Sequence, residues 1–285
     1  MAEFWCGDEC AAQAYAVQTL RPPVDLTKLR ENPQAHVSAF EPDRYWGTPA
    51  MAQMSGDTAI VKVSGSMIAG EAGWRRAFGY TGYEDLKGAL VEAVGKAEVK
   101  SILLYMDTPG GMVNGVEGTA RLIREVSKVK PVVAYAATAA SAGYWLASAA
   151  EYIVADNTSV LGSLGSIIQL VNLVDAYAKD GIKFYTYKSG SLKMAGNDKE
   201  EMTEEASKYF QQQVEDMTAI FYAGIAKYRN MDVNTLRSDF GDGRSVLAAR
   251  ALAGGLIDEI GGTGEALRKV NELASQRSNV NLQAL

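Results

Sequence analysis

Histidine is almost absent from this sequence: the single histidine, His36, lies in a proline-rich stretch near the N-terminus. A Ser-His-Asp or Cys-His catalytic group would have to take its base from that stretch, so we expect His36 to be a solvated surface residue. The same scarcity argues against zinc hydrolases, because histidines supply most of their metal ligands. The chemistry of this chain must be sought in other side chains.

Cysteine is equally scarce, with Cys6 and Cys10 the only two in the chain. No cluster of other metal-binding side chains stands near them, which excludes a disulfide scaffold and a structural zinc site. We expect free thiols in a reducing compartment. The N-terminus lacks the basic start and apolar run of a signal peptide, so the sequence predicts a cytoplasmic protein.

Basic blocks and long aliphatic runs are also missing. The net charge is -6, from 28 Lys and Arg against 34 Asp and Glu, so nucleic acid is not expected to be a direct partner. Residues 132–150 carry no charge, but their only large aliphatic residues are Val132, Val133 and Leu146. This stretch predicts a buried strand, a tight turn and a small-residue helix rather than a membrane span.

What is present is the composition of a globular protein, with 47% hydrophobic residues in 285. Five of the seven prolines fall within residues 1–55, which predicts an irregular N-terminal segment there. We expect one α/β domain over residues 56–270 and a polar, mobile C-terminal tail over residues 271–285.

Apolar runs of strand length alternate with helical periodicity from Thr58 onward, which predicts an α/β fold with mostly parallel pairing. Function is then expected at the strand-to-helix loops. The predicted strands are 58–63, 101–106, 132–136, 152–155, 183–187 and 254–262. The predicted helices are 83–95, 116–129, 141–150, 174–179, 204–228, 233–239 and 246–253, so that the C-terminal part is largely helical.

One candidate loop, Asp107-Thr108-Pro109-Gly110-Gly111, follows the 101–106 strand. Its glycines could turn consecutive N–H groups toward a ligand, as in an oxyanion cradle, although an ordinary Pro-Gly turn explains it as well. A second candidate, Ser141, lies where a strand gives way to a helix. It could be a helix N-cap, or a nucleophile whose oxyanion is stabilised at a helix N-terminus.

A serine nucleophile needs a base, and without histidine the remaining candidate is a lysine kept neutral by burial. Lys193 lies in a Gly/Ser-containing loop after a predicted strand, 52 residues beyond Ser141. Ser163, 22 residues beyond Ser141, also follows a strand and could hold the lysine amine by a hydrogen bond.

Taken together, these residues resemble the signal peptide peptidase A family of serine-lysine peptidases, and most of all its phage prohead and capsid-assembly branch. The resemblance covers about residues 57–262. It rests on GYTGYEDL at 79–86, DTPGG at 107–111, AASAGY at 139–144, GSLGS at 162–166, SGSLK at 189–193, DGR at 242–244 and GGLIDE at 254–259.

The resemblance implies a peptidase with Ser141 as nucleophile, Lys193 as general base and Ser163 as the residue that orients the lysine. It implies an oxyanion hole made by the N–H groups of Gly111 and Ala142. The implied fold is a ClpP/crotonase-like spiral of ββα units that assembles into homo-oligomeric rings. No metal or organic cofactor is implied.

The chain departs from the cellular, membrane-anchored members because no N-terminal transmembrane helix is recognisable, and because Ala142 stands where those members often have glycine. We therefore expect a phage or prophage head-maturation protease that cleaves scaffold and capsid proteins, in the host cytoplasm or the prohead. The alternative within the family is a soluble bacterial peptidase that degrades peptides.

Two other classes are weighed. A crotonase-type acyl-CoA enzyme would share the fold but use carboxylates, and no catalytic glutamate is recognised in the matching loops. An inactive assembly module would not need the serine and lysine. A homo-oligomer is also expected from the apolar side chains after Glu204, which exceed the need of one sheet face: Tyr209, Phe210, Met217, Ile220, Phe221 and Tyr222.

Overall fold

The computed structural model describes residues 52–283. Cys6, Cys10 and His36, with nearly all of the segment 1–55 that was expected to be irregular, lie outside the described residues. Within the described part the chain forms a mixed α/β structure around a largely parallel sheet, as the alternating pattern predicts.

The main sheet has eight strands, six of which follow one another across it: β1 (Ala52–Ser55), β2 (Thr58–Ser64), β5 (Ser101–Thr108), β6 (Val132–Ala140), β7 (Tyr152–Ala155) and β10 (Glu259–Ile260). Only β1 runs antiparallel along this path. The last residues of β6 pair with β8 (Val160–Gly162), which in turn pairs antiparallel with β9 (Ser245–Leu247). A small second sheet joins β3 (Ser66–Ile68) to β4 (Tyr80–Gly82), with the 3₁₀ helix η3 (Gly73–Phe78) between them.

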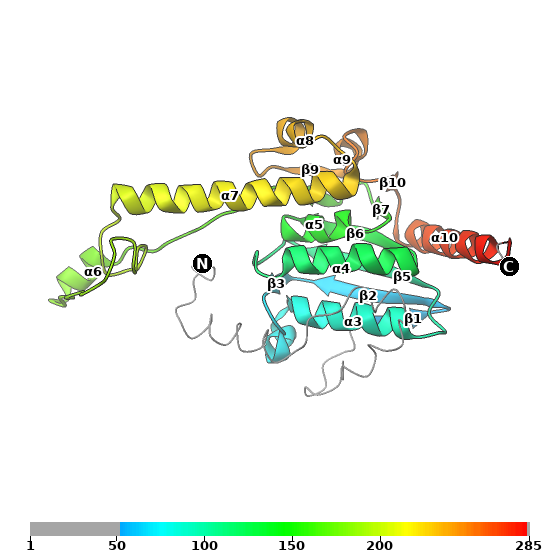
Figure 1. The fold of residues 1–285 in the computed structure, drawn as a ribbon, viewed down its shortest axis with the longest axis horizontal. Coiled ribbons are helices and arrows are strands. Elements are labelled where there is room, and N and C mark those ends of the chain that lie inside the picture. Colours follow the sequence, from blue (N-terminus) through cyan, green and yellow to red (C-terminus); the bar gives the residue numbers. More distant parts are fainter. Residues whose placement is uncertain (1–51, 284–285) are drawn as a thin grey trace.

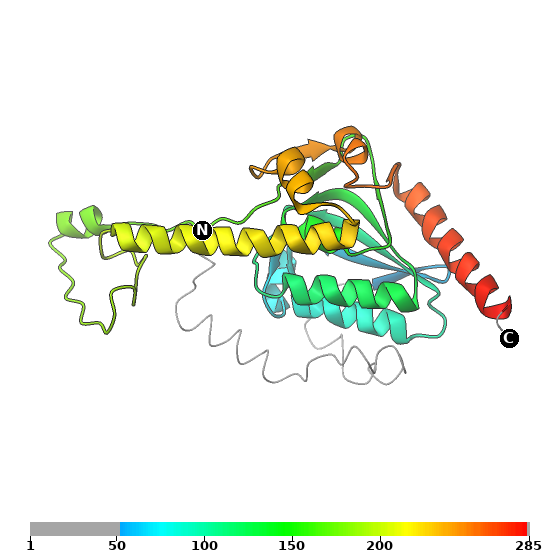
Figure 2. The same cartoon turned by 45° about the horizontal axis from the view of Figure 1, so that its top comes forward.

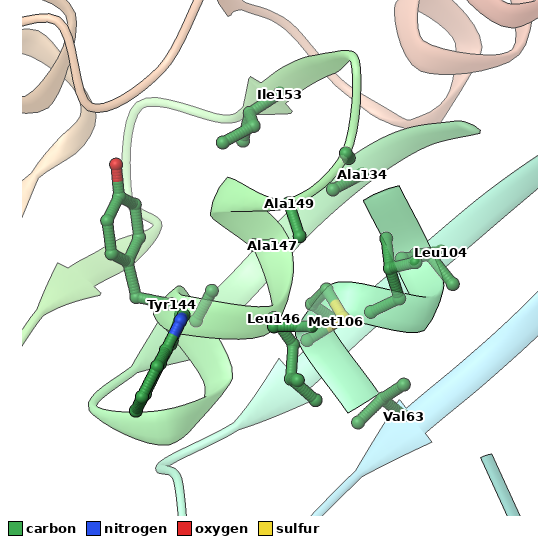
Figure 3. Close-up of a cluster of buried hydrophobic side chains, with 14 of the residues drawn as sticks. Val63, Leu104, Met106, Ala134, Tyr144, Leu146, Ala147, Ala149 and Ile153 are labelled. Carbon is green, nitrogen blue, oxygen red and sulfur yellow. The ribbon is translucent and has the colours of Figure 1, made fainter. Parts of the chain in front are cut away.

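Helices cover both faces of the sheet because successive strand residues point to opposite sides. In β5, Ile102, Leu104 and Met106 face the core under α3 (Tyr83–Gly95), α4 (Val116–Val129) and α5 (Ala142–Ser148). Figure 3 shows Leu104 and Met106 lying beside Leu146 of α5. On the opposite side, Leu103 belongs to a smaller cluster closed by Ala266 and Val270 of α10 (Thr263–Gln283).

A long helix, α7 (Glu204–Arg229), carries part of the chain away from this body (Figures 1 and 2). Its C-terminal half packs on the body beside α8 (Val233–Phe240) and α9 (Ala248–Ala253). Its N-terminal half extends outward, together with α6 (Val174–Lys179) and the loops around it. We call residues 167–215 the projecting arm. No helix within the described residues is long and apolar enough to cross a membrane.

The structure corrects three expectations. Residues 183–187, predicted as a strand, have no regular secondary structure and lie on the projecting arm. Residues 271–283, predicted as a mobile tail, continue α10 without interruption. The strand predicted over 254–262 is confined to the two residues of β10. The helices predicted at 83–95, 116–129 and 174–179 are confirmed, with the same ends.

Candidate active site

The carboxyl ends of β5, β6 and β8 meet at one edge of the sheet. Thr108 pairs with Ala139, and Ala140 pairs with Gly162. The residues that follow these strands, the 109–111 loop, Ser141 and Ser163, are therefore neighbours in space although they are far apart in the sequence. This is the edge at which ligands bind in open parallel sheets.

Ser141 has an unusual backbone between β6 and α5. Its φ is 53° and its ψ is -126°, a conformation that is costly for a residue with a side chain and is concentrated at functional sites. Its carbonyl accepts the first helical hydrogen bonds, from the N–H groups of Tyr144 at 2.9 Å and Trp145 at 3.2 Å. Its side chain makes no capping hydrogen bond with α5. Ser141 thus stands at the N-cap position while its hydroxyl remains available for chemistry.

The 109–111 loop passes directly against Ser141. A Cβ atom on Gly110 would lie 2.8 Å from the Cβ of Ser141 and 3.1 Å from the backbone nitrogen of Ala142, and Gly110 has a φ of 105°. Only glycine permits this approach. The hydroxyl of Thr108 braces the loop by donating to the Gly65 carbonyl at 2.6 Å and accepting from the Gly110 N–H at 3.1 Å.

Two backbone N–H groups near Ser141, those of Gly111 and Ala142, are the oxyanion donors that the family resemblance predicts. Met67 of β3 bonds the Gly110 carbonyl and the Met112 N–H, both at 2.9 Å, in a parallel bridge opposite Gly111. In such a bridge the N–H of Gly111 itself points away from β3. Ala142 is the first residue of α5, and the first N–H groups of a helix have no partner within the helix.

The GYTGYEDL segment (79–86) supports the 109–111 loop from the side of α3. Tyr83 is buried and its hydroxyl donates to the Met112 carbonyl at 2.6 Å, next to the 109–111 loop. Burial raises the pKa of Tyr83 well above its usual value, so the hydroxyl stays protonated and donates. Asp85 accepts from the Ala72 N–H at 2.7 Å and pairs with Arg76 at 3.0 Å, which ties the start of α3 to the β3–β4 connection.

Ser163 lies beside Ser141 at the end of β8. It too has a φ of 53°, and its N–H donates to the Arg244 carbonyl at 2.8 Å. The carbonyl of the preceding residue, Gly162, accepts from the Ser141 N–H at 2.7 Å. The Ser141 N–H is therefore hydrogen-bonded to the peptide group that immediately precedes Ser163.

Lys193 is placed elsewhere. It is exposed on the projecting arm, where the nearby Ser191 hydroxyl donates to Glu205 at 3.0 Å near the start of α7. Phe221, sixteen residues farther along the same helix, lines the pocket of Ser141. Sixteen helical residues span about 24 Å, whereas the two residues from Ser191 to Lys193 span at most about 7 Å. Within one copy of this structure Lys193 does not reach Ser141.

A largely apolar pocket opens beside Ser141. Trp145 of α5 and Phe221 of α7 form one wall, with ring centroids 5.1 Å apart. Met217 and Phe221 were expected to face other subunits, but both line this pocket. The sequence did not indicate this role, because it depends on the packing of α7 on α5. The full lining comprises Gly111, Val113, Val116, Ser141, Ala142, Trp145, Gly165, Ser166, Ile167, Met217 and Phe221. Across residues 52–283, no three His, Cys, Asp or Glu side chains converge as a metal site requires.

A serine with a strained backbone between a parallel strand and a helix N-terminus is typical of one class of protein, the serine hydrolases. Comparison with known families narrows this class. A model of peptidase family S49 matches residues 124–277, more than half of the chain, so the chain belongs to this family of serine peptidases. The match includes Ser141, Ala142, Ser163 and Lys193 and begins after Gly111. Membership implies a fold of the ClpP/crotonase type.

Individual relatives support the same family. A candidate protease of Methanocaldococcus jannaschii is 35% identical over 179 residues, 62% of this chain and 57% of the relative. A candidate signal peptide peptidase of Enterococcus faecium is 34% identical over 174 residues, 59% and 49% of the two chains. Capsid assembly protease C of Escherichia phage lambda is 28% identical over 228 residues, 80% and 52%. The chain spans about half the length of the curated relatives it matches.

Proposed function

We propose that this protein is a serine endopeptidase in which Ser141 is the nucleophile, Lys193 the general base and Ser163 the residue that orients the lysine. The observation that carries the proposal is the strained, positive-φ backbone of Ser141, whose side chain makes no capping hydrogen bond and lies against the 109–111 loop. A structural N-cap would need neither feature. Membership of a serine peptidase family supplies the reaction type.

The proposed reaction is acyl transfer. The neutral lysine takes the hydroxyl proton of Ser141, the serine oxygen attacks a peptide carbonyl, and the oxyanion is received by the N–H groups of Gly111 and Ala142. The protonated lysine then returns its proton to the leaving amine, and water releases the acyl group by the same steps in reverse order. Each oxyanion donor contributes about 3 kcal/mol to lowering the barrier. The mechanism uses no metal or organic cofactor.

The position of Lys193 adds a requirement. Because Lys193 is exposed on the projecting arm, the proposed mechanism needs a docking event that buries it beside Ser141. We propose that this happens in a closed homo-oligomer, in which the projecting arm of one copy docks at the site of another. Support comes from the arm itself, which exposes apolar side chains to an extent that isolated globular proteins avoid, including Ile167 at 78%, Tyr185 at 79% and Tyr187 at 95%.

The proposed setting is head maturation of a phage or prophage, with scaffold and capsid proteins as substrates. The similarity to a capsid assembly protease over 80% of this chain supports it. The alternative setting is a bacterial protease resembling signal peptide peptidase that degrades peptides, which the Enterococcus relative supports. Co-expression with a capsid or scaffold protein encoded beside this chain separates the settings: specific trimming of that protein supports the phage role, and indifference to it supports the alternative.

Labelling with a fluorophosphonate tests the serine. We expect one label per chain, on Ser141, which Ser141→Ala abolishes and Ser238→Ala, at an exposed serine on α8, leaves intact. Cleavage of a fluorescent casein should increase with pH, because the base must lose its proton. A crotonase-type acyl-CoA enzyme with a carboxylate base would instead remain unlabelled and work best under acidic conditions. An inactive assembly module would show neither labelling nor cleavage.

A further inference from the structure

The segment Asp242-Gly243-Arg244 joins α8 to β9 and has no part in the reaction described above. It lies 79 residues beyond Ser163 in the sequence, counted to Asp242, yet the pairing of β8 with β9 brings the two together, with Gly162 opposite Ser245 and Leu161 opposite Val246. The contact falls at Ser163, one of the five non-glycine residues in the described part of the chain with a positive φ. A strained residue persists only where its surroundings hold it.

The turn holds Ser163 through its backbone. Asp242 and Gly243 are both left-handed, with φ values of 64° and 68°, and their consecutive turn brings the Arg244 carbonyl to 2.8 Å from the Ser163 N–H. The Arg244 side chain returns to pair with Asp242 at 2.7 Å, at the surface. The carbonyl of Arg244, rather than its guanidinium, therefore makes the contact with the site.

A second hydrogen bond holds the backbone at Leu164, the residue after Ser163. The hydroxyl of Tyr222, on α7, donates to the Leu164 carbonyl at 3.2 Å. Tyr222 is buried, and burial raises its pKa, so its hydroxyl remains a donor. The side chain of Leu164 is buried as well. The peptide before Ser163 is thus held at its N–H by Arg244 and at its carbonyl by Ser141, and the peptide after Leu164 is held by Tyr222.

We propose that the Asp242–Arg244 turn and Tyr222 form a positioning device that keeps Ser163 in its left-handed conformation and directs its hydroxyl to the catalytic lysine. This inference rests on the proposed function, because it presumes that Ser163 orients Lys193. It explains why the short DGR segment stands at this point of the chain. It also makes Tyr222 a link between α7, which begins in the projecting arm, and the site itself.

The test changes the backbone preference of the Asp242–Arg244 turn at a position where an added side chain meets no neighbour. A Cβ atom on Gly243 would meet nothing within 4 Å, so Gly243→Ala strains the left-handed backbone without a steric clash. Gly243→Asn is the milder variant, because asparagine tolerates the left-handed conformation better than alanine does. Gly56→Ala is the matched control, because Gly56 has a φ of 64° and equally open surroundings in the β1–β2 turn. Both alanine variants should lose a similar amount of thermal stability.

Only Gly243→Ala should lose activity on a quenched-fluorescence peptide. We expect kcat to fall several-fold, by no more than in Ser163→Ala, with little change in KM, because misplacement of an orienting group acts on the transition state. Gly243→Asn should recover most of this loss. Tyr222→Phe removes only the hydroxyl and should lower kcat in the same direction, which keeps the test valid if Gly243→Ala folds poorly.

Several results would overturn the proposal: unchanged kcat in both Gly243→Ala and Tyr222→Phe, an equal loss in Gly56→Ala, or no recovery in Gly243→Asn. A crystal structure of Gly243→Ala gives an answer independent of activity, since Ser163 should leave its left-handed conformation. If wild type is labelled at Ser141 while these variants match it, the positioning role fails and the proposed function stands. If Ser141 is never labelled, the proposed function fails first.

Discussion

The indole of Trp145 packs against the ring of Phe221 with centroids 5.1 Å apart, which joins the helix that follows Ser141 to the helix that carries the projecting arm. Gly224 makes this contact possible, since a Cβ atom there would lie 2.5 Å from the indole nitrogen. The projecting arm is therefore connected through α7 to Trp145, four positions from the proposed nucleophile.

This packing predicts a large difference between two adjacent residues of α7. Phe221 is 4% exposed and Ile220 is 52% exposed. Phe221→Ala should destabilise the protein by about 3–5 kcal/mol, because a buried aromatic side chain is lost and a cavity remains. Ile220→Ala should cost about 1 kcal/mol or less, as is usual at the surface. Urea unfolding of both variants measures the difference, and equal losses would show that α7 does not pack on α5 in solution.

The close approach of the 109–111 loop predicts that Gly110→Ala prevents fluorophosphonate labelling. The added methyl group must displace either the loop or Ser141, and an alanine would also be strained at the φ of 105° that Gly110 adopts. Gly118→Ala is the matched control, since Gly118 lies inside α4 with nothing within 4 Å of an added Cβ. It should keep full labelling and gain about 0.5–1 kcal/mol of stability, because alanine is the better helix former. Normal labelling of Gly110→Ala would contradict the described geometry.

The separation of Lys193 from Ser141 predicts complementation between two inactive variants. Ser141→Ala and Lys193→Ala should each retain less than about a tenth of the wild-type cleavage rate, and Ser163→Ala should lose less. If another copy supplies the lysine, a mixture of the first two variants regains activity, because some sites combine an intact serine with an intact lysine. Light scattering at micromolar concentration should show an oligomer. A fully active species of 30.6 kDa would instead require the arm to fold back within one chain.

Lys130 predicts a change of stability with pH. Burial, with a further contribution from Lys100, lowers the pKa of its ammonium from 10.5 to about 8, while the Nζ atom donates to the carbonyls of Ala93 and Lys96. Between pH 8 and 10.5 the unfolded chain then binds more protons at this residue than the folded chain, so its contribution to stability increases as pH rises through that window.

Denaturant unfolding at several pH values checks this expectation. The difference in free energy of unfolding between wild type and Lys130→Met should shift in favour of wild type from pH 8 to pH 10. Lys128→Met, at an exposed lysine near the end of α4, is the control for the loss of one positive charge. Parallel pH curves for wild type and Lys130→Met would mean that Lys130 titrates like a solvated lysine.

The sequence predicted those helices and strands whose apolar spacing matches the face that they bury. The helices α3 and α4 carry apolar residues at helical spacing and sit between strands, so their ends were predictable. Residues 183–187 have the aromatic and β-branched composition of a strand, but on the projecting arm no neighbouring strand pairs with them. Three-residue strands such as β8 were missed because so short a run carries little periodicity.

The candidate site divides in the same way. Ser141 follows a predicted strand, whereas Ser163 follows β8, which was missed. Once β8 is paired with β6, both residues lie at one edge, so their proximity follows from the sheet topology. The distance of Lys193 does not, because it depends on how α7 leaves the body. The roles of Met217 and Phe221 in the pocket depend on contacts with residues more than 70 positions away, which no local motif encodes.

The position of Lys193 on the projecting arm would make the activity of the protein depend on its concentration. A peptidase whose base comes from another copy has no complete site below the dissociation constant of the assembly, so its specific activity falls steeply on dilution. Freshly made chains, scattered at low concentration, would then be harmless to the cell that makes them. Cleavage would begin only where many copies are gathered in a small volume, so the local concentration of the protein would control when it becomes active.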